Sequence, residues 1–263
     1  MNFFRKRVVF ASAFLCWILL CCSCFTRLAA QDTTHVKKWN FLADVYLMFP
    51  YMNGETGIGQ SLVLPIDANP GDIFSKLQMG GFLYLEAQTD KYALTSDLVY
   101  MDLTQDVSPG KILNSGEVNA KQFIWEFAGL YRLSSFLEIG IGGRLNYIQM
   151  EANALIHKIP SGTEEVSGRQ SKTWLDPILI ARFATDIKDK WLFQVRGDLG
   201  GFNIGSVYSW QLQGYAGYRF TKWFQLTAGY RILSTNYADG EAPKEFIFDV
   251  NESGPVIRLG FRF

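Results

Sequence analysis

Only two histidines, His35 and His157, are available in this 263-residue chain for general-base or metal-ligand chemistry. His157 lies in a polar stretch with four side chains that could act with it: Glu151, Ser161, Glu164 and Glu165. A hydrolase or acyltransferase that acts at a membrane surface would need such a set. No spacing among these residues is diagnostic, and a solvated polar loop has the same composition. We therefore predict no catalytic residues and no enzyme activity, with a rim-active hydrolase or acyltransferase as the alternative.

Metal and cofactor chemistry has no better support. All four cysteines lie near the start of the chain: Cys16, Cys21, Cys22 and Cys24. Two distant histidines without a cysteine do not make a zinc site. The segment Gly57-Ile58-Gly59 lacks the strand-to-helix setting of a nucleotide-binding turn. We expect neither a metal nor an organic cofactor.

The first thirty residues have the pattern of a cleaved secretory signal peptide. Three basic residues at positions 5–7 precede an apolar run over 8–25, and Leu28-Ala29-Ala30 offers small residues for cleavage before Gln31. A retained membrane anchor is the alternative. Removing residues 1–30 also removes four basic residues, which leaves 21 basic against 25 acidic ones. Nothing in this balance suggests a nucleic-acid partner. We expect residues 31–38 to form a short periplasmic leader before one domain at 39–263.

The end of the chain reads as a strand with two different faces. One face carries Ile257, Leu259, Phe261 and Phe263. The other carries Val256, Arg258, Gly260 and Arg262. Side chains alternate with period two along a strand, so one face is apolar and the other bears arginine. Such a strand suits a sheet with lipid outside and a polar lumen inside. We also expect the apolar face to be the C-terminal signal recognised by the barrel-assembly machinery.

The rest of the chain extends this pattern. No apolar run of spanning length follows Gln31, and in hydrocarbon only helices and closed barrels satisfy every backbone group. Apolar side chains recur at every second position in further segments, and counting these segments predicts an all-β, transmembrane, antiparallel up-and-down barrel of ten strands, with eight or twelve as alternatives. A secreted β-sandwich or soluble barrel is the competing interpretation. Tight turns such as Lys91-Tyr92 and Lys222-Trp223 indicate the periplasmic rim, and longer connections near 105–120, 152–172 and 236–244 the extracellular side.

Residues 53–77 interrupt the strand pattern. We interpret them as the first extracellular loop, because one extra strand over 56–67 would put the tight turn at 89–91 on the wrong side. Asn69-Pro70 predicts the start of a short helix that continues through Leu77, with a capping residue followed by proline at the first helical position. This helix could enter the barrel mouth as a partial plug or pack on the rim.

Parity sends charged side chains of both signs into the lumen. The acids are Asp44, Glu86, Asp97, Glu126, Glu138, Asp176 and Asp198. The bases are Arg132, Arg144, Arg182, Arg196, Arg219, Arg231, Arg258 and Arg262. A ten-stranded barrel is only slightly wider than the eight-stranded size that side chains fill. Arginine meets carboxylates bidentately, so we expect a network of ion pairs that holds the barrel together. A narrow pore or ligand path lined by the same groups is the alternative.

Several phrases resemble a known family. They include the run from Pro65 to Leu77, residues 96–103, residues 197–206, Gly229-Tyr-Arg231 and Ser253-Gly-Pro255. Together they resemble a family of largely uncharacterised, porin-like bacterial outer-membrane β-barrel proteins, over nearly the whole mature chain. The resemblance implies fold and location, and it implies no catalytic residue or ligand.

These observations give one expected function and its alternatives. We expect a porin-like or structural barrel in the bacterial outer membrane, exported through its signal peptide, with outer-membrane lipid as a partner. Small solutes could use a narrow passage. A binding or uptake barrel for a small apolar ligand is the further alternative, suggested by the aromatic-rich strands.

Overall fold

The computed structural model describes residues 39–58, 62–107, 113–157, 163–185, 190–241 and 245–263. The chain divides into two units, Met1–Lys38 and Trp39–Phe263. Every described residue belongs to the second unit. The expected signal peptide (1–30) and leader (31–38) lie outside the described residues.

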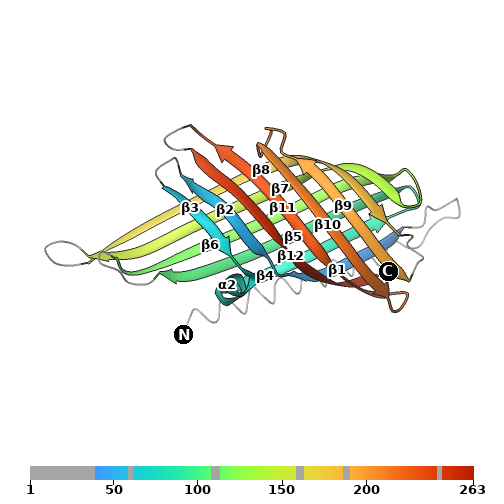
Figure 1. The fold of residues 1–263 in the computed structure, drawn as a ribbon, viewed down its shortest axis with the longest axis horizontal. Coiled ribbons are helices and arrows are strands. Elements are labelled where there is room, and N and C mark those ends of the chain that lie inside the picture. The colour runs from blue at the N-terminus through green and yellow to red at the C-terminus, as the bar shows by residue number, and fades with distance from the viewer. Residues whose placement is uncertain (1–38, 59–61, 108–112, 158–162, 186–189, 242–244) are drawn as a thin grey trace, which may run out of the picture. The chain divides into compact units, whose positions relative to one another are not determined.

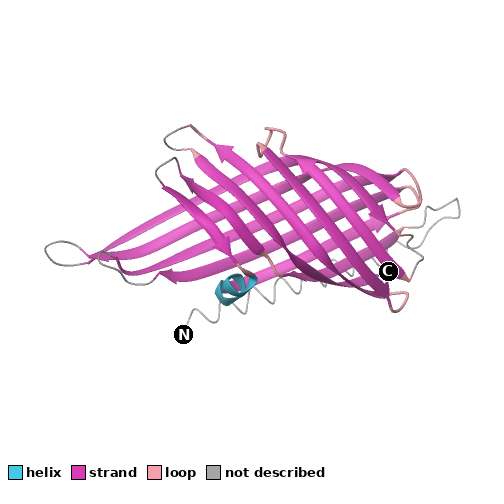
Figure 2. Ribbon diagram, in the orientation of Figure 1, coloured by secondary structure: helices cyan, strands magenta, loops and turns pink. Residues whose placement is uncertain are grey.

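Ten antiparallel strands close into a barrel (Figures 1 and 2). They are β1 (Asn40–Met48), β4 (Leu77–Gln88), β5 (Tyr92–Val107), β6 (Leu113–Arg132), β7 (Leu137–His157), β8 (Thr163–Ala184), β9 (Trp191–Gly200), β10 (Tyr208–Arg219), β11 (Phe224–Asp239) and β12 (Phe246–Arg262). Neighbours in the chain are neighbours in the sheet, and β1 pairs with both β4 and β12 to close the cylinder. The predicted fold class and the ten-strand count are confirmed.

One end of the barrel has short turns and the other has tall hairpins. Tight connections at residues 89–91, 133–136 and 220–223 lie at one end, which we call the short-turn end. The last residue, Phe263, lies at this end too. Strand β9 has 10 residues, the length that one membrane crossing needs. Strand β8 has 22, so it reaches far beyond β9 at the other end, which we call the hairpin end (Figure 1).

The long loops expected at 105–120, 152–172 and 236–244 are mostly strand. Among the described residues of these regions, strands β5 to β8 and β11 continue and stay paired, as in the pair Gln149–Ser171. The prediction was wrong because it relied on apolar alternation. A strand that extends beyond the lipid-facing belt needs no apolar outer face, and its backbone hydrogen bonds still maintain the ladder.

The predicted first loop contains a hairpin and a helix. Strands β2 (Tyr51–Ile58) and β3 (Leu62–Ala68) pair with each other, and β2 also pairs with the upper part of β12. Strand β2 therefore continues β1 after Pro50, while β3 runs back toward β4. The loop prediction was wrong, because excluding one added strand does not exclude two. Two added strands return the chain to the same side and leave the turn at 89–91 where the barrel needs it.

Helix α2 (Pro70–Lys76) joins β3 to β4. Asn69 caps it by accepting a hydrogen bond from the Asp72 backbone N–H, and the Asp72 carboxylate accepts one from the Asn69 N–H. The ring of Phe74 contacts that of Phe49 at 5.3 Å, and Phe49 follows the outward-facing Leu47 by two residues. The helix thus packs on the wall, as Figure 2 shows, and not as a plug inside. Among the described residues, no helix has the length and apolar character needed to cross a membrane.

The two faces of the wall have opposite chemistry. In β1 the side chains of Asp44, Tyr46 and Met48 are buried in the lumen, while Val45 and Leu47 are more than half exposed outside. The same alternation leaves large apolar side chains on the outer face of other strands. They include Ile141, Leu179, Phe193, Leu199 and Ile257. Because a water-soluble monomer rarely exposes such a continuous apolar surface, this exterior suits contact with lipid.

Candidate functional site in the barrel lumen

The centre of the lumen holds a neutral cluster of two arginines and two carboxylates from strands β6, β7 and β9. The Nη2 of Arg144 donates to Glu126 at 2.9 Å and to Asp198 at 2.6 Å. Arg196 also donates to Glu126 and lies 3.5 Å from Asp198. Gln211 donates to both carboxylates. All five side chains are buried. Full mutual pairing is what makes buried charges tolerable in such a place.

A second ion pair at the same level joins β11 to β5. Arg231 donates to Asp97 at 3.1 Å and to the Tyr46 hydroxyl at 3.1 Å. The Tyr46 hydroxyl donates to the other oxygen of Asp97 at 2.6 Å. This triad fixes the side chains across the barrel from the central cluster.

Nearer the short-turn end, Arg182 of β8 binds two carboxylates. Its two terminal nitrogens donate to Glu86 at 2.7 and 3.0 Å, and its Nε donates to Glu138 at 2.5 Å. Arg132 donates to Glu138 at 2.8 Å and to Gln88 at 3.1 Å. The bidentate geometry is the one that the planar guanidinium favours.

Arg258 is held differently from the other arginines. Its guanidinium carbon lies 4.0 Å from the centre of the Tyr215 ring, 4.9 Å from that of Tyr46 and 5.0 Å from that of Tyr84. It donates to the Tyr215 hydroxyl at 2.7 Å, and Asp44 lies 3.7 Å away. Aromatic faces attract cations, so three tyrosines carry much of the stabilisation that carboxylates supply elsewhere.

Asp176 does not join an arginine. Its carboxylate accepts hydrogen bonds from the backbone N–H of Ser206 at 2.6 Å, from the Ser206 hydroxyl at 2.9 Å and from Asn146 at 3.3 Å. Asp176 thus anchors the connection between β9 and β10. Its predicted lumen position agrees with its burial, but its role is to hold a loop.

Two layers of apolar side chains lie between the ionic layers and the hairpin end of the barrel. The first joins Met48, Phe82, Val99, Met101, Ile124, Leu233 and Val256. A cavity of about 10 Å³ lies beside it, about the space of one water. The second, near the hairpin end, joins Ile148, Trp174, Tyr237, Phe246, Phe248 and Val250. Along the described wall, the bore is therefore filled by side chains at successive levels.

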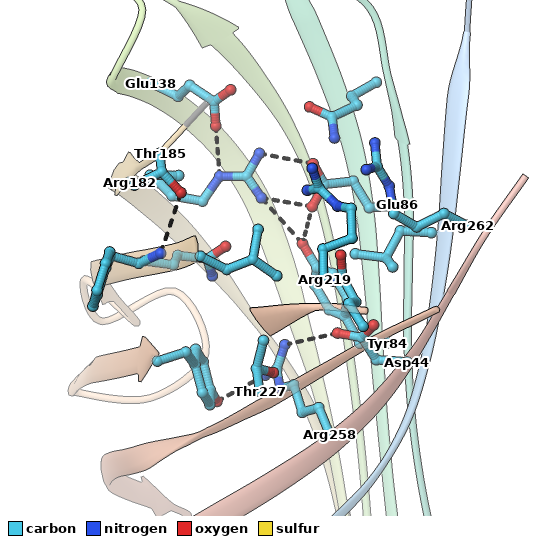
Figure 3. Close-up of a pocket in the computed structure, with 18 of the residues that line it drawn as sticks. Asp44, Tyr84, Glu86, Glu138, Arg182, Thr185, Arg219, Thr227, Arg258 and Arg262 are labelled. Carbon is cyan, nitrogen blue, oxygen red and sulfur yellow. Dashed lines mark hydrogen bonds and ion pairs between the residues drawn. The ribbon is translucent and has the colours of Figure 1, made fainter. Parts of the chain in front are cut away.

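Below the ionic layers, a cavity of about 100 Å³ lies at the short-turn end (Figure 3). Of the predicted lumen residues, eight line it: Asp44, Glu86, Arg132, Glu138, Arg182, Arg219, Arg258 and Arg262. Arg132, Arg219 and Arg262 are partly exposed at its mouth, whereas the other five are buried deeper. The cavity therefore opens toward the short turns.

Sequence reasoning missed several residues of this network. Glu252 accepts a hydrogen bond from Gln122 inside the lumen, and it shares the parity of Arg258, so extending the last strand upward would have found it. Tyr46, Tyr84 and Tyr215 also have inward parity. They were missed because we looked only for charged side chains on that face.

The structure does not describe the alternative site around His157, but it does describe the residues of the expected C-terminal signal. Ser161 and the side chains of His157, Glu164 and Glu165 lie outside what the structure describes, so no geometry bears on them. Among the described residues there is no group of histidine, aspartate and glutamate able to hold a metal. Ile257, Leu259 and Phe261 lie exposed on the outer wall, and Phe263 stacks on Phe41 at 5.8 Å.

A closed antiparallel barrel with an apolar exterior and a polar, side-chain-filled interior defines a transmembrane β-barrel protein. No protein-family model matches the chain, and no curated protein does.

Solved outer-membrane barrels are similar to it in structure. The Escherichia coli outer membrane protease OmpT aligns over 88% of this chain and 99% of its own, with 9% identity and a TM-score of 0.40. The Pseudomonas putida toluene transporter TodX covers 87% and 91%, with 7% identity and 0.39. Ail, the attachment invasion locus protein of Yersinia pestis, covers 87% and 100%, with 12% identity and 0.37.

Proposed function

We propose that this protein is an outer-membrane barrel with a closed lumen, which serves as a structural scaffold and not as an open pore. In this proposal the short-turn end faces the periplasm and the tall hairpins stand at the cell surface. The observation that carries the proposal is the filling of the bore. The Arg144–Glu126–Asp198 cluster and the Arg231–Asp97 pair fill the lumen from opposite walls, and the apolar layer around Phe82 and Met101 lies next to them toward the hairpin end.

A scaffold needs a rigid wall, and buried ion pairs favour rigidity. Each lumen arginine described above links strands that are not adjacent or binds two partners at once, as Arg182 does with Glu86 and Glu138. A solvated channel wall would instead keep its charges separated by water. The same interactions that exclude solutes thus support the hairpins at the surface.

Planar-bilayer recording of the refolded protein tests this proposal. We expect no steady conductance from the wild type. The comparison is a variant that shortens both layers without leaving an unpaired charge: Glu126→Ala, Arg144→Ala, Arg196→Ala and Asp198→Ala, combined with Phe82→Ala and Met101→Ala. Conductance of that variant would show that these two layers are the main barrier, and Leu179→Ala on the outer face should stay silent. Steady ohmic conductance of the wild type would overturn the proposal.

A second candidate function is uptake of a small apolar molecule. Pairing between β1 and β4 stops at Val45–Leu83, and Met79 above this point is 59% exposed. The wall is interrupted there beside the apolar layer of Met48 and Phe82, with α2 next to the gap. Mass spectrometry of the purified protein after lipid extraction would test this function. A stoichiometric apolar solute that Phe82→Trp excludes would favour it over the scaffold.

The absence of enzyme activity, which we expect from the sequence, stays a prediction. The polar residues around His157 are the alternative site, and His157→Ala is the direct test. Loss of any lipid- or peptide-directed hydrolysis in this variant, with unchanged folding, would establish the alternative.

A further inference from the structure

The lumen charges are unevenly distributed along the barrel axis. In the middle, Arg144, Arg196 and Arg231 balance Asp97, Glu126 and Asp198. Toward the hairpin end, Asp176 and Glu252 accept hydrogen bonds from neutral donors. The cavity at the short-turn end has the opposite balance, because five arginines line it against three carboxylates. The cavity therefore carries a net charge of +2 whatever the individual pairing.

The positive field at this end comes mainly from the lining of the cavity itself. In the turns at the same end, the lysines Lys91, Lys188, Lys190 and Lys222 are nearly balanced in the sequence by Asp90, Asp186 and Asp189. A concave site with walls of low dielectric constant concentrates the field of its charges and attracts ions of opposite sign. Anions near this end are thus drawn toward the cavity mouth.

The geometry of the mouth suits a small oxyanion. Figure 3 shows Arg182, Arg219 and Arg262 on the Glu86 side of the cavity, with Arg258 beside Asp44. Arg219 and Arg262 end β10 and β12, and both are partly exposed. A guanidinium group presents paired N–H donors that match the oxygens of phosphate. The cavity volume of about 100 Å³ accommodates a phosphate group with a few waters.

We propose that the cavity at the short-turn end is a binding site for a phosphate group, either as free phosphate or as part of a small phosphomonoester. The arginines at the mouth, Arg219 and Arg262, are its main attracting charges, and Arg182 and Arg258 form its floor. This site is separate from the closed bore above it. It allows the protein to bind a periplasmic anion without conducting it.

Equilibrium dialysis of the detergent-refolded protein against inorganic phosphate and against glycerol 3-phosphate tests the proposal. The variant Arg219→Gln with Arg262→Gln removes two cavity charges. The control Lys190→Gln with Lys222→Gln removes two charges from the same end but outside the cavity. We expect the arginine variant to weaken binding about tenfold or more, and the lysine variant to weaken it less than about threefold. Tighter binding of one probe than the other identifies which source of phosphate the site prefers.

A variant that should bind phosphate more tightly separates a loss of the binding site from a loss of folding. One buried oxygen of Asp44 has no hydrogen-bond partner, so Asp44→Asn removes a negative charge without removing a fully paired group. It should bind phosphate more tightly than the wild type. The proposal is wrong if neither probe binds the wild type, if the lysine control weakens binding as much as the arginine variant, or if Asp44→Asn weakens it. Preference for succinate over both phosphates would also overturn it.

Discussion

The ring of Trp174 on β8 lies against the ring of Tyr237 on β11, with centroids 4.0 Å apart and planes 10° from parallel. Strands β9 and β10 separate β8 from β11 in the sheet, but both end lower, at Gly200 and Tyr208. The stack therefore joins the two tall walls directly above the β9–β10 connection. The Trp174 indole N–H also donates to Ser206 in that connection at 2.8 Å.

We predict that Trp174→Ala separates these walls at the hairpin end. Removing a buried tryptophan costs ~3–5 kcal/mol of folding free energy. The expected result is a lower midpoint in urea unfolding and new protease cleavage above Gly200. Trp174→Phe keeps a ring against Tyr237 and should recover most of the loss. Equal effects of the two substitutions would show that the hydrogen bond to Ser206, and not the stack, joins the walls.

The central ionic cluster should respond very differently to single and paired substitutions. Arg144→Met leaves Glu126 and Asp198 short of a partner, and breaking a buried pair in this way costs ~3–5 kcal/mol. Arg144→Met combined with Asp198→Leu keeps Glu126 with Arg196 and restores neutrality. We expect the double variant to unfold at a higher urea concentration than Arg144→Met alone. Additive losses in the double-mutant cycle would contradict the coupling.

A surface ion pair at the hairpin end provides the contrast. Lys172 and Asp239 lie 2.5 Å apart, but both side chains are substantially exposed. Exposed pairs contribute ~0–1 kcal/mol and are screened by salt. Lys172→Met should change the urea midpoint little, and less still in 1 M salt. A loss as large as that of Arg144→Met would mean that this pair, and not the stacked rings, closes the hairpin end.

Glycine at position 260 is required by the space beside Asp44. A Cβ there would lie 2.5 Å from the Asp44 carboxylate and 2.6 Å from Cγ of Gln225. Gly260→Ala should displace Asp44 from Arg258 and cost ~1–3 kcal/mol. Gly214 is the matched control, because a Cβ there meets nothing within 4 Å. If Gly214→Ala proves as costly, backbone freedom and not crowding explains the effect.

The terminal aromatic residue gives a prediction about assembly. We expect deletion of Phe263 to reduce insertion by the assembly machinery in cells while refolding in detergent continues. The outward-facing Ile257, Leu259 and Phe261 remain on the last strand in this variant. Heat-modifiable mobility of protein from cells and of refolded protein measures the two processes separately. Equal loss in both would assign Phe263 a folding role through its contact with Phe41.

The sequence was most informative where one face of a strand meets lipid. Alternation of Val45 and Leu47 with Asp44 and Tyr46 indicates both the strand and its faces, because each side chain has a single suitable environment. Farther toward the hairpin end the regular apolar alternation of β7 and β8 stops, although the strands continue. The number of strands was therefore predictable, but their height was not.

The partners of the lumen charges were not predictable in the same way. Alternation along the strand shows that Asp176 and Arg258 point inward, but it does not show which side chains of other strands they meet inside the barrel. Asp176 binds a loop and Arg258 lies among tyrosines, since those are the groups that curvature and register bring near them. Only pairs on adjacent strands, such as Glu126 with Arg144, follow from the order of strands alone.

The detour between Phe49 and Leu77 has a practical consequence. Strand β2 extends the wall beside β12, and β3 and α2 then lead the chain back to β4, so residues 50–76 add no crossing of the barrel and the ten strands close with the same neighbours. A foreign peptide placed between β2 and β3 would consequently project outward while strand pairing around the barrel is preserved. With the orientation proposed above, an inserted epitope would be displayed at the cell surface.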